Sequence, residues 1–451
     1  MSTPERLRLN TIAGPLLGEF LLGMTVAMGG LWLASHESDA AAGAFGLVNQ
    51  ILETLSVAFR VLAIGLGVMV TQYVGGGQHA AARRVALLAL GASSWVGAAI
   101  MLVVVAGNDV MLDWLNAPAM VASLAAPYLQ WFAPALLLDA YNLSMAAVLR
   151  AHLFAKDSLR IMIAMHGTHL ALAFVIMRGW GSWDGMGLEG YAIAMLISRA
   201  LGLVLHLWFW RVRMQLTPSR QDWWRFAWVD FAPVLRVGLP GAGVEVTYRA
   251  AFMVSLAATA RLGVTALATH SYTLQLLKYV LLTSMAIGWA CEIMVGRLVG
   301  AGDLRAANGL VRKAVRNGLL ASGSLALFAA LGAPWLMRAF TKDAAVIEAA
   351  QTLLWLSLLL ETGRVFNLIL NGALRATGDA IYPAVSSVAS LVLVLGVGSF
   401  WLGRLFGLPG IWLAYALDEW IRGLLLLSRW LWRGWLPNAR DSRRRLRAEK
   451  N

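Results

Sequence analysis

The sequence predicts an all-α, polytopic membrane protein with twelve transmembrane helices in two six-helix lobes. Three observations predict it: the composition, the number of long apolar segments and an internal repeat. Of the 451 residues, 59% are hydrophobic and only 14% are charged, whereas soluble domains have roughly 45–50% apolar and about 25% charged residues. A soluble protein of this length would lack the polar residues needed to cover its surface.

Twelve segments are long and apolar enough to cross a bilayer, for which a helix needs about 20 residues. We expect the spans at 12–34, 44–72, 85–106, 122–148, 159–178, 189–210, 233–259, 265–298, 314–338, 347–373, 381–402 and 407–433. The first segment is too long for a signal peptide, so no cleavage is expected. The single cysteine, Cys291, excludes a disulfide framework.

The basic residues predict the orientation. Most of the 37 Lys and Arg residues lie at the ends of spans that would share one side of the membrane. Few fall on the other side, namely Arg178, Arg261, Arg338, Lys342 and Arg404. This bias predicts that both termini are cytoplasmic, in a bacterial inner (plasma) membrane. It also explains the net charge of +13 without a nucleic-acid partner.

The two halves of the chain align when one is shifted by 225 residues. Pro15 then falls on Pro240, Gln50 on Gln275 and Asn142 on Asn367. After a slip of five residues, the segment 187–190 falls on 407–410. The shift carries six spans, an even number, so the halves enter the membrane in the same sense and form a parallel repeat. Such an architecture suits alternating access to a site between two lobes.

The repeat predicts the domain organisation. We expect an amino-terminal lobe over 1–213, a cytoplasmic linker over 214–232 and a carboxy-terminal lobe over 233–435. The Arg-rich end, 436–451, is predicted to be a solvated, disordered tail that touches anionic lipid.

Several short motifs recur in order along the chain. They are Ile12-Ala13-Gly14-Pro15, then 72–77 (QYVGGG), Gly238-Leu239-Pro240, 295–303 (VGRLVGAGD) and 374–379 (LRATGD). These motifs resemble those of the multidrug and toxic compound extrusion (MATE) family, within the MOP flippase superfamily. The resemblance covers roughly residues 8–435. It implies twelve helices in two lobes that export cationic or amphiphilic compounds in exchange for Na⁺ or protons.

The sequence departs from the family's coupling motifs. The stretch 24–27 lacks the acid that one branch has in the first span, and Arg364 stands where another branch has an Asp. Glu245 lies three residues before the position of that branch's acid in the seventh span. The resemblance therefore leaves H⁺ and Na⁺ both open as the coupling ion.

Charged residues inside the spans are functional candidates, because each costs about 2.5–3.5 kcal/mol at mid-membrane. Candidates for substrate or ion binding are Glu53, Asp139, Asn142, Glu245, Lys278, Arg364 and Asn367. Candidates for coupling or gating are Glu19, Arg249, Glu361, Asp418 and Arg422. The alternative for these ions is a structural role, as pairs that fix helix orientation within one lobe.

The repeat places opposite charges at equivalent positions, with Glu53 matching Lys278 and Asp139 matching Arg364. We hypothesise that at least one such pair is a gate that closes in one state and parts in another. Pro15 and Pro240 are hinge candidates, since a proline frees a backbone carbonyl; the alternative is an ordinary first-turn proline.

The sequence predicts a transporter and not an enzyme. No lysine follows a glycine, which excludes a Walker-type phosphate loop, and neither HExxH nor GxSxG with triad partners is present. We expect no catalytic residues, no metal site and no cofactor beyond the coupling ion. The expected partners are a small-molecule substrate and membrane lipid, with the chain as a monomer. A lipid or lipid-linked oligosaccharide flippase of the same superfamily is the alternative.

Overall fold

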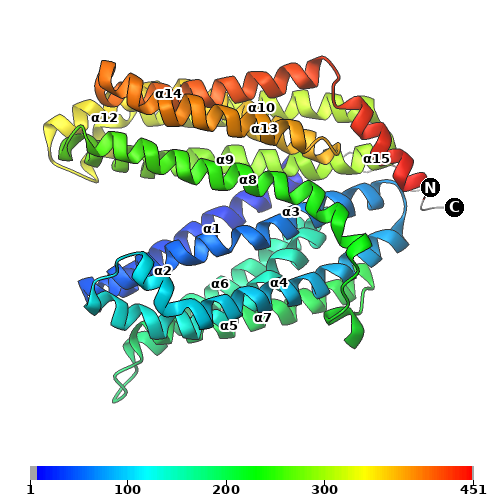
Figure 1. Ribbon diagram of the computed structural model, residues 1–451, viewed down its shortest axis with the longest axis horizontal. Coiled ribbons are helices and arrows are strands. Elements are labelled where there is room, and N and C mark those ends of the chain that lie inside the picture. Colours follow the sequence, from blue (N-terminus) through cyan, green and yellow to red (C-terminus); the bar gives the residue numbers. More distant parts are fainter. Residues whose placement is uncertain (1–7, 449–451) are drawn as a thin grey trace. The chain divides into compact units, whose positions relative to one another are not determined.

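The computed structural model describes residues 8–448, which fold almost entirely into helices (Figure 1). The first half of the chain forms α1 (Asn10–Ser35), α2 (Asp39–Leu55), α3 (Val57–Gly75), α4 (His79–Trp114), α5 (Ala119–Ala151), α6 (Ala155–Arg178) and α7 (Gly187–Met214). The second half forms α8 (Trp228–Ala260), α9 (Val264–Ala301), α10 (Leu304–Leu331), α11 (Ala333–Arg338), α12 (Ala344–Ala376), α13 (Ile381–Ser390), η2 (Leu391–Val397), α14 (Gly398–Leu431) and α15 (Leu436–Ala448).

The chain divides into two compact units. The amino-half unit comprises Gly18–Val70 and His79–Gly238, and the carboxy-half unit comprises Thr71–Gln78, Leu239 onward and the described residues up to Leu17. Within the described residues, ten helical segments are long and apolar enough to cross a membrane. The long segment Ile381–Leu431 counts once among them, although Gly407 breaks it with a φ of 63°.

Gly407 therefore separates two spans, as the sequence predicts, and Figure 1 shows α14 returning beside α13. The helix α8 falls outside the ten because Glu245, Arg249 and other charged residues lower its hydropathy. When α8 is added and Ile381–Leu431 is counted as two spans, the ten segments become twelve, which agrees with the predicted layout. The second expected span, 44–72, proves to be two consecutive helices, α2 and α3.

Each unit has its own apolar core. In the amino-half unit, the rings of Phe45, Tyr128 and Tyr191 pack together, with Phe45 and Tyr191 edge to face at 5.2 Å between centroids. In the carboxy-half unit, Trp412 packs against His270 and donates its indole N–H to the imidazole Nδ1 at 3.1 Å. Each core leaves a buried polar atom without a hydrogen bond among the described residues: Tyr128 Oη in the amino-half unit and His270 Nε2 in the carboxy-half unit.

The connection after α7 differs from the expected cytoplasmic linker over 214–232. A short helix, η1 (Arg220–Trp223), packs on α4, where a Cβ added to Gly91 would overlap the carbonyl oxygen of Arg225. The indole of Trp95 donates to the carbonyl of Trp224 at 3.1 Å. These contacts fix the segment to the amino-half unit, so the boundary falls after Gly238.

The Arg-rich end is not the expected disordered tail over its described part, because Leu436–Ala448 forms the helix α15 (Figure 1, red). The helix begins after Trp435, whose ring stacks on Trp430 at 4.5 Å between centroids. Its buried side includes Ala439 and Leu446. The hydroxyl of Ser442 donates to the carbonyl of Thr377 at 3.3 Å, so apolar packing and a hydrogen bond both hold the helix in place.

Glycines let the end of α3 cross α9 with direct backbone contact inside the carboxy-half unit. A Cβ added to Gly75 would overlap the carbonyl oxygen of Arg297, and one added to Gly300 would overlap that of Gln72. The two contacts are equivalent under the 225-residue repeat, since Gly75 corresponds to Gly300 and Gln72 to Arg297. Any larger residue at either glycine would force the helices apart.

Candidate functional site

An ion pair between α5 and α7 lies at the centre of the amino-half unit. The Nε of Arg199 lies 2.5 Å from Oδ1 of Asp139. The backbone carbonyl of Arg199 accepts a hydrogen bond from the side-chain amide of Asn142 at 2.9 Å. The amide oxygen of Asn142 in turn contacts the Nδ1 of His206 at 3.1 Å. Two of the predicted site residues, Asp139 and Asn142, thus act together through a residue of the seventh helix.

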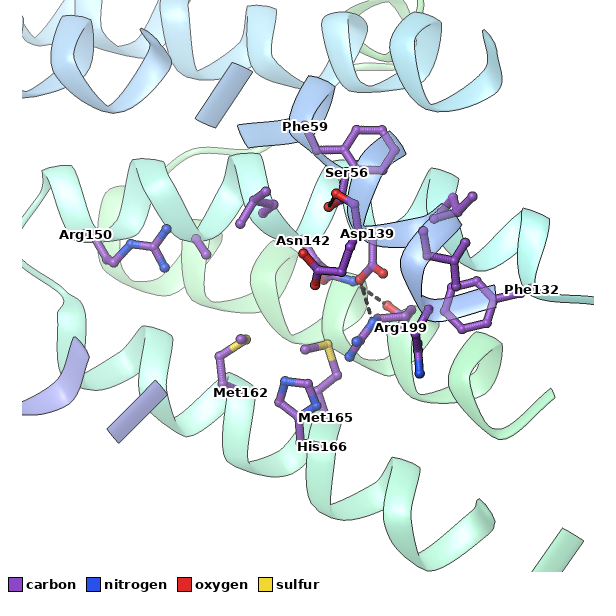
Figure 2. A pocket seen from close by; sticks show the side chains of 16 residues that line it. Ser56, Phe59, Phe132, Asp139, Asn142, Arg150, Met162, Met165, His166 and Arg199 are labelled. Atoms are coloured by element: carbon purple, nitrogen blue, oxygen red, sulfur yellow. Dashed lines mark hydrogen bonds and ion pairs between the residues drawn. The ribbon is translucent and has the colours of Figure 1, made fainter. Parts of the chain in front are cut away.

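This ion pair borders a cavity of about 260 Å³. Figure 2 shows the side chains of Asp139, Arg199 and His166 directed toward the same space. The walls are mostly apolar, and their larger side chains are Phe59, Phe132, Leu136, Met162 and Met165. A largely apolar space with a few convergent polar groups is the usual form of a small-molecule site.

Two further acids of the amino-half unit are already paired. The carboxylate of Glu19 contacts Nη1 of Arg150 at 2.9 Å, and both side chains are buried. Glu53 lies 3.7 Å from Arg60, and its side chain is 61% exposed. The buried pair is suited to tie α1 to α5, whereas Glu53 lines the cavity with an accessible side chain.

A denser network of ionisable residues lies between α12 and α14 in the carboxy-half unit. Arg364 forms an ion pair with Glu361 and places its Nε 3.2 Å from Oε1 of Glu419. Arg422 pairs with Asp418 and lies 3.3 Å from the same Glu419 oxygen. All five side chains are at least nine-tenths buried. Three carboxylates therefore face two guanidinium groups.

Neighbouring polar groups complete this carboxy-half network. The side-chain amide of Asn367 donates to Oε2 of Glu419 at 2.7 Å, and the hydroxyl of Ser390 donates to Oδ1 of Asp418 at 2.7 Å. Ser390 immediately precedes η2, a seven-residue π-helical turn. Such turns often occur at functional sites. The remaining oxygen of Glu361, Oε2, is buried without a hydrogen bond among the described residues.

The two ion pairs occupy equivalent positions with reversed charge. The 225-residue shift places Asp139 on Arg364 and Asn142 on Asn367, and the five-residue slip places Arg199 on Glu419. Each half thus has an acid–base pair beside an asparagine, but the acid is on α5 in one half and on α14 in the other. Asp139 and Arg364 each have a partner in their own unit, which supports the structural alternative. The gate between them stays a hypothesis.

The other predicted residues lie apart from these two clusters. Glu245 and Arg249 form a half-buried pair on α8 at 3.3 Å. Lys278 is exposed, and its ammonium donates to Oε1 of Gln275 at 2.9 Å. Pro15 and Pro240 both lie inside helices, beyond the first turn of α1 and of α8. A proline at such a position leaves one backbone carbonyl of the helix without its usual donor, and the hinge role of both residues stays a prediction.

Sequence reasoning missed several partners. Arg375 binds Glu292 through two contacts, at 3.1 and 2.8 Å, and Arg150 at the equivalent position binds Glu19. The pairing of Arg199 with Asp139 and of Glu419 with Arg364 does not follow from the spacing within one helix. The five-residue slip pairs these two positions, so the repeat carried a signal for both.

The fold and the sites define a multi-pass membrane protein built from two related helical halves. A family model described as MatE matches residues 15–175 and 240–420. Its two matched segments begin at equivalent positions of the repeat. Because the match covers most of the chain, the protein belongs to the MatE family of transporters.

Relatives and solved structures agree with this assignment. An uncharacterized transporter, YisQ, of Bacillus subtilis is 28% identical over 95% of this chain and 94% of its own length. A probable multidrug resistance protein, NorM, of Thermotoga maritima is 25% identical over 98% and 96%. The fold matches that of the Vibrio cholerae MATE transporter VcmN, with a TM-score of 0.85, 18% identity and coverage of 96% and 97%. It also matches an outward-facing MATE transporter with a TM-score of 0.84, 16% identity and coverage of 98% and 96%.

Proposed function

We propose that this protein is a secondary active exporter of cationic or amphiphilic compounds. It exchanges them for H⁺ or Na⁺ by alternating access between its two lobes. Relatives named as probable multidrug resistance proteins support the substrate class. We further propose a bacterial inner membrane location with both termini cytoplasmic, on the basis of the distribution of Lys and Arg.

The observation that carries the coupling proposal is the charge imbalance of the carboxy-half network. Three buried carboxylates face two guanidinium groups, which leaves one excess negative charge among Glu361, Asp418 and Glu419. An uncompensated charge in a membrane-spanning segment is costly. A proton on one carboxylate, or a bound Na⁺, removes this cost. The Oε2 of Glu361, which has no hydrogen-bond partner within residues 8–448, is the oxygen best placed to receive either ion.

The direct test is transport by the purified protein in liposomes, with sodium and proton gradients imposed separately. The probe is a fluorescent cation such as ethidium. Movement that depends on one gradient supports the exchanger and names the ion. No movement under either gradient, by protein shown to be folded, contradicts the proposal and favours the lipid or oligosaccharide flippase.

A pair of variants on α12 assigns the coupling site. Glu361→Gln removes the excess negative charge and is expected to abolish gradient-driven transport while the protein still folds. Glu348→Gln, on the same helix but exposed, is the matched control and should transport like the unmodified protein. Full gradient-driven transport by Glu361→Gln would remove this carboxylate from the coupling mechanism.

A further inference from the structure

We propose that the cavity of the amino-half unit binds a carboxylate of the substrate on the guanidinium of Arg199. The substrates would then be amphiphiles that carry a carboxylate beside an apolar part, either as monoanions or as zwitterions. This inference rests on the proposed export function and narrows its substrate class.

The first argument is an unused donor on Arg199, a residue that lines the cavity. Arg199 is 92% buried, and its Nε faces Asp139 at 2.5 Å. Its Nη1 is buried and has no hydrogen-bond partner among the described residues. Buried donors are normally bonded, so an exception calls for a missing partner. A carboxylate is the group that matches the planar fork of an arginine.

A second unpartnered group borders the same space. The Nδ1 of His166 is buried without a hydrogen bond within the described part of the chain, and His166 lines the cavity with Arg199. Figure 2 shows the guanidinium of Arg199 between Asp139 and the imidazole of His166. An imidazole nitrogen can donate to an anion or accept from a protonated one. The two groups together form one polar end of an otherwise apolar cavity.

The arginines of the carboxy-half network contact more carboxylates than Arg199 does, and this difference favours an anionic ligand at Arg199. There, Arg364 contacts two carboxylates, and Arg422 also contacts two. In the amino-half unit the equivalent network has one acid, Asp139, whose side chain is 30% exposed. The charge of Arg199 is therefore less fully neutralised by protein carboxylates than that of Arg364 or Arg422, so Arg199 can still attract an anionic ligand.

The shape and charge of the cavity limit the ligand. Phe59, Phe132 and Met165 offer apolar walls for the body of an amphiphile. The volume of about 260 Å³ lies just below the roughly 300–1,000 Å³ of drug-sized sites, so the cavity holds the carboxylate end of such a molecule. Asp139 would repel a doubly charged phosphate, which favours a single negative charge.

A matched pair of dyes tests the proposal without any gradient. A rhodamine with a free carboxylate and its methyl ester differ only in the group that Arg199 would bind. Fluorescence anisotropy with purified protein in detergent measures the affinity for each. We expect the unmodified protein to bind the acid more tightly than the ester, by on the order of tenfold.

The variants separate loss of the site from loss of the fold. Asp139→Asn should strengthen binding of the acid, because Arg199 loses its protein counterion. The double variant Asp139→Asn/Arg199→Gln keeps the pair uncharged, and should lose the preference for the acid while it still binds the ester. Arg199→Lys should retain part of the preference. Arg211→Gln, exposed on the same helix α7, is the control and should bind as the unmodified protein does.

Equal affinity for the acid and the ester, or no binding of the acid, would overturn the proposal. An unchanged preference in the double variant would overturn it as well. The export function is judged separately, by movement of the ester in liposomes under an ion gradient. Export of the ester without a preference for the acid would refute the carboxylate site alone, and no export would refute the proposed function.

Discussion

Arg199 binds Asp139 at 2.5 Å in one half of the chain, and the equivalent pair in the other half, Glu419 and Arg364, has the charges reversed. The asparagine beside each pair is retained. It binds the backbone of Arg199 in one half and the carboxylate of Glu419 in the other. The halves thus share one polar framework, which supplies a spare guanidinium donor in the first half and a spare carboxylate oxygen in the second.

The charges of the amino-half pair should be exchangeable. Asp139→Arg or Arg199→Asp alone leaves two like charges together and should lower stability by at most about 3 kcal/mol, because Asp139 is partly exposed. Asp139→Arg with Arg199→Asp should restore the thermal midpoint measured in detergent. Asp139→Arg with Arg364→Asp, the exchange between equivalent positions, should not restore it. Restored transport in the latter variant would instead support a gate between those residues.

The acids of the carboxy-half network should differ in their effect on stability. Glu419 contacts both Arg364 and Arg422 and accepts a hydrogen bond from Asn367, whereas one oxygen of Glu361 has no partner among the described residues. Glu419→Gln is therefore expected to destabilise the protein by about 3 kcal/mol, and Glu361→Gln by much less. Thermal unfolding in the same detergent compares the two. Equal losses would contradict the assignment of the excess charge to Glu361.

Glu245 on α8 is expected to contribute to transport and little to folding. Its carboxylate is half-buried beside Arg249, so a neutral amide can hydrogen-bond there without an unpaired buried charge. Glu245→Gln should abolish export from liposomes while the yield and the thermal midpoint are retained. Normal export by this variant would exclude Glu245 from the mechanism.

The glycine crossing of α3 and α9 should tolerate no side chain. Gly75→Ala or Gly300→Ala would place a methyl group against a carbonyl oxygen and should cost about 1–3 kcal/mol. Gly309→Ala on α10 is the control, because a Cβ there meets nothing within 4 Å. This control should stabilise its helix by about 0.5–1 kcal/mol. A thermal midpoint of Gly75→Ala at or above that of the control would show that the crossing can open.

The sequence predicts the spans well because hydropathy is a local property. The expected ends of 12–34 and 189–210 lie within a few residues of α1 and α7. Over 436–448, where the sequence predicts a disordered tail, the structure has the helix α15, which is polar and packs through only a few apolar residues such as Leu446. No local pattern reveals that such a helix finds a surface to cover.

The composition of the sites was harder to predict than the spans. Pairs one helical turn apart, such as Glu245 and Arg249 or Asp418 and Arg422, follow from the helix period. The partner of Asp139 lies sixty residues away on another helix, and only packing brings the two together. The identification of Asp139 as a candidate was therefore possible from sequence, but its partner was not.

The crossing of Gly75 and Gly300 also shows what a single chain allows that a pair of identical subunits does not. Equivalent backbone atoms meet there in two equivalent contacts, which is the relationship that identical subunits have across a two-fold axis. Six-helix subunits paired as a symmetric homodimer would make this contact in the same way. In such a dimer both copies must carry the same residue at each position. The opposite charges of Asp139 and Arg364 require halves with different sequences, which a single chain allows and a homodimer does not.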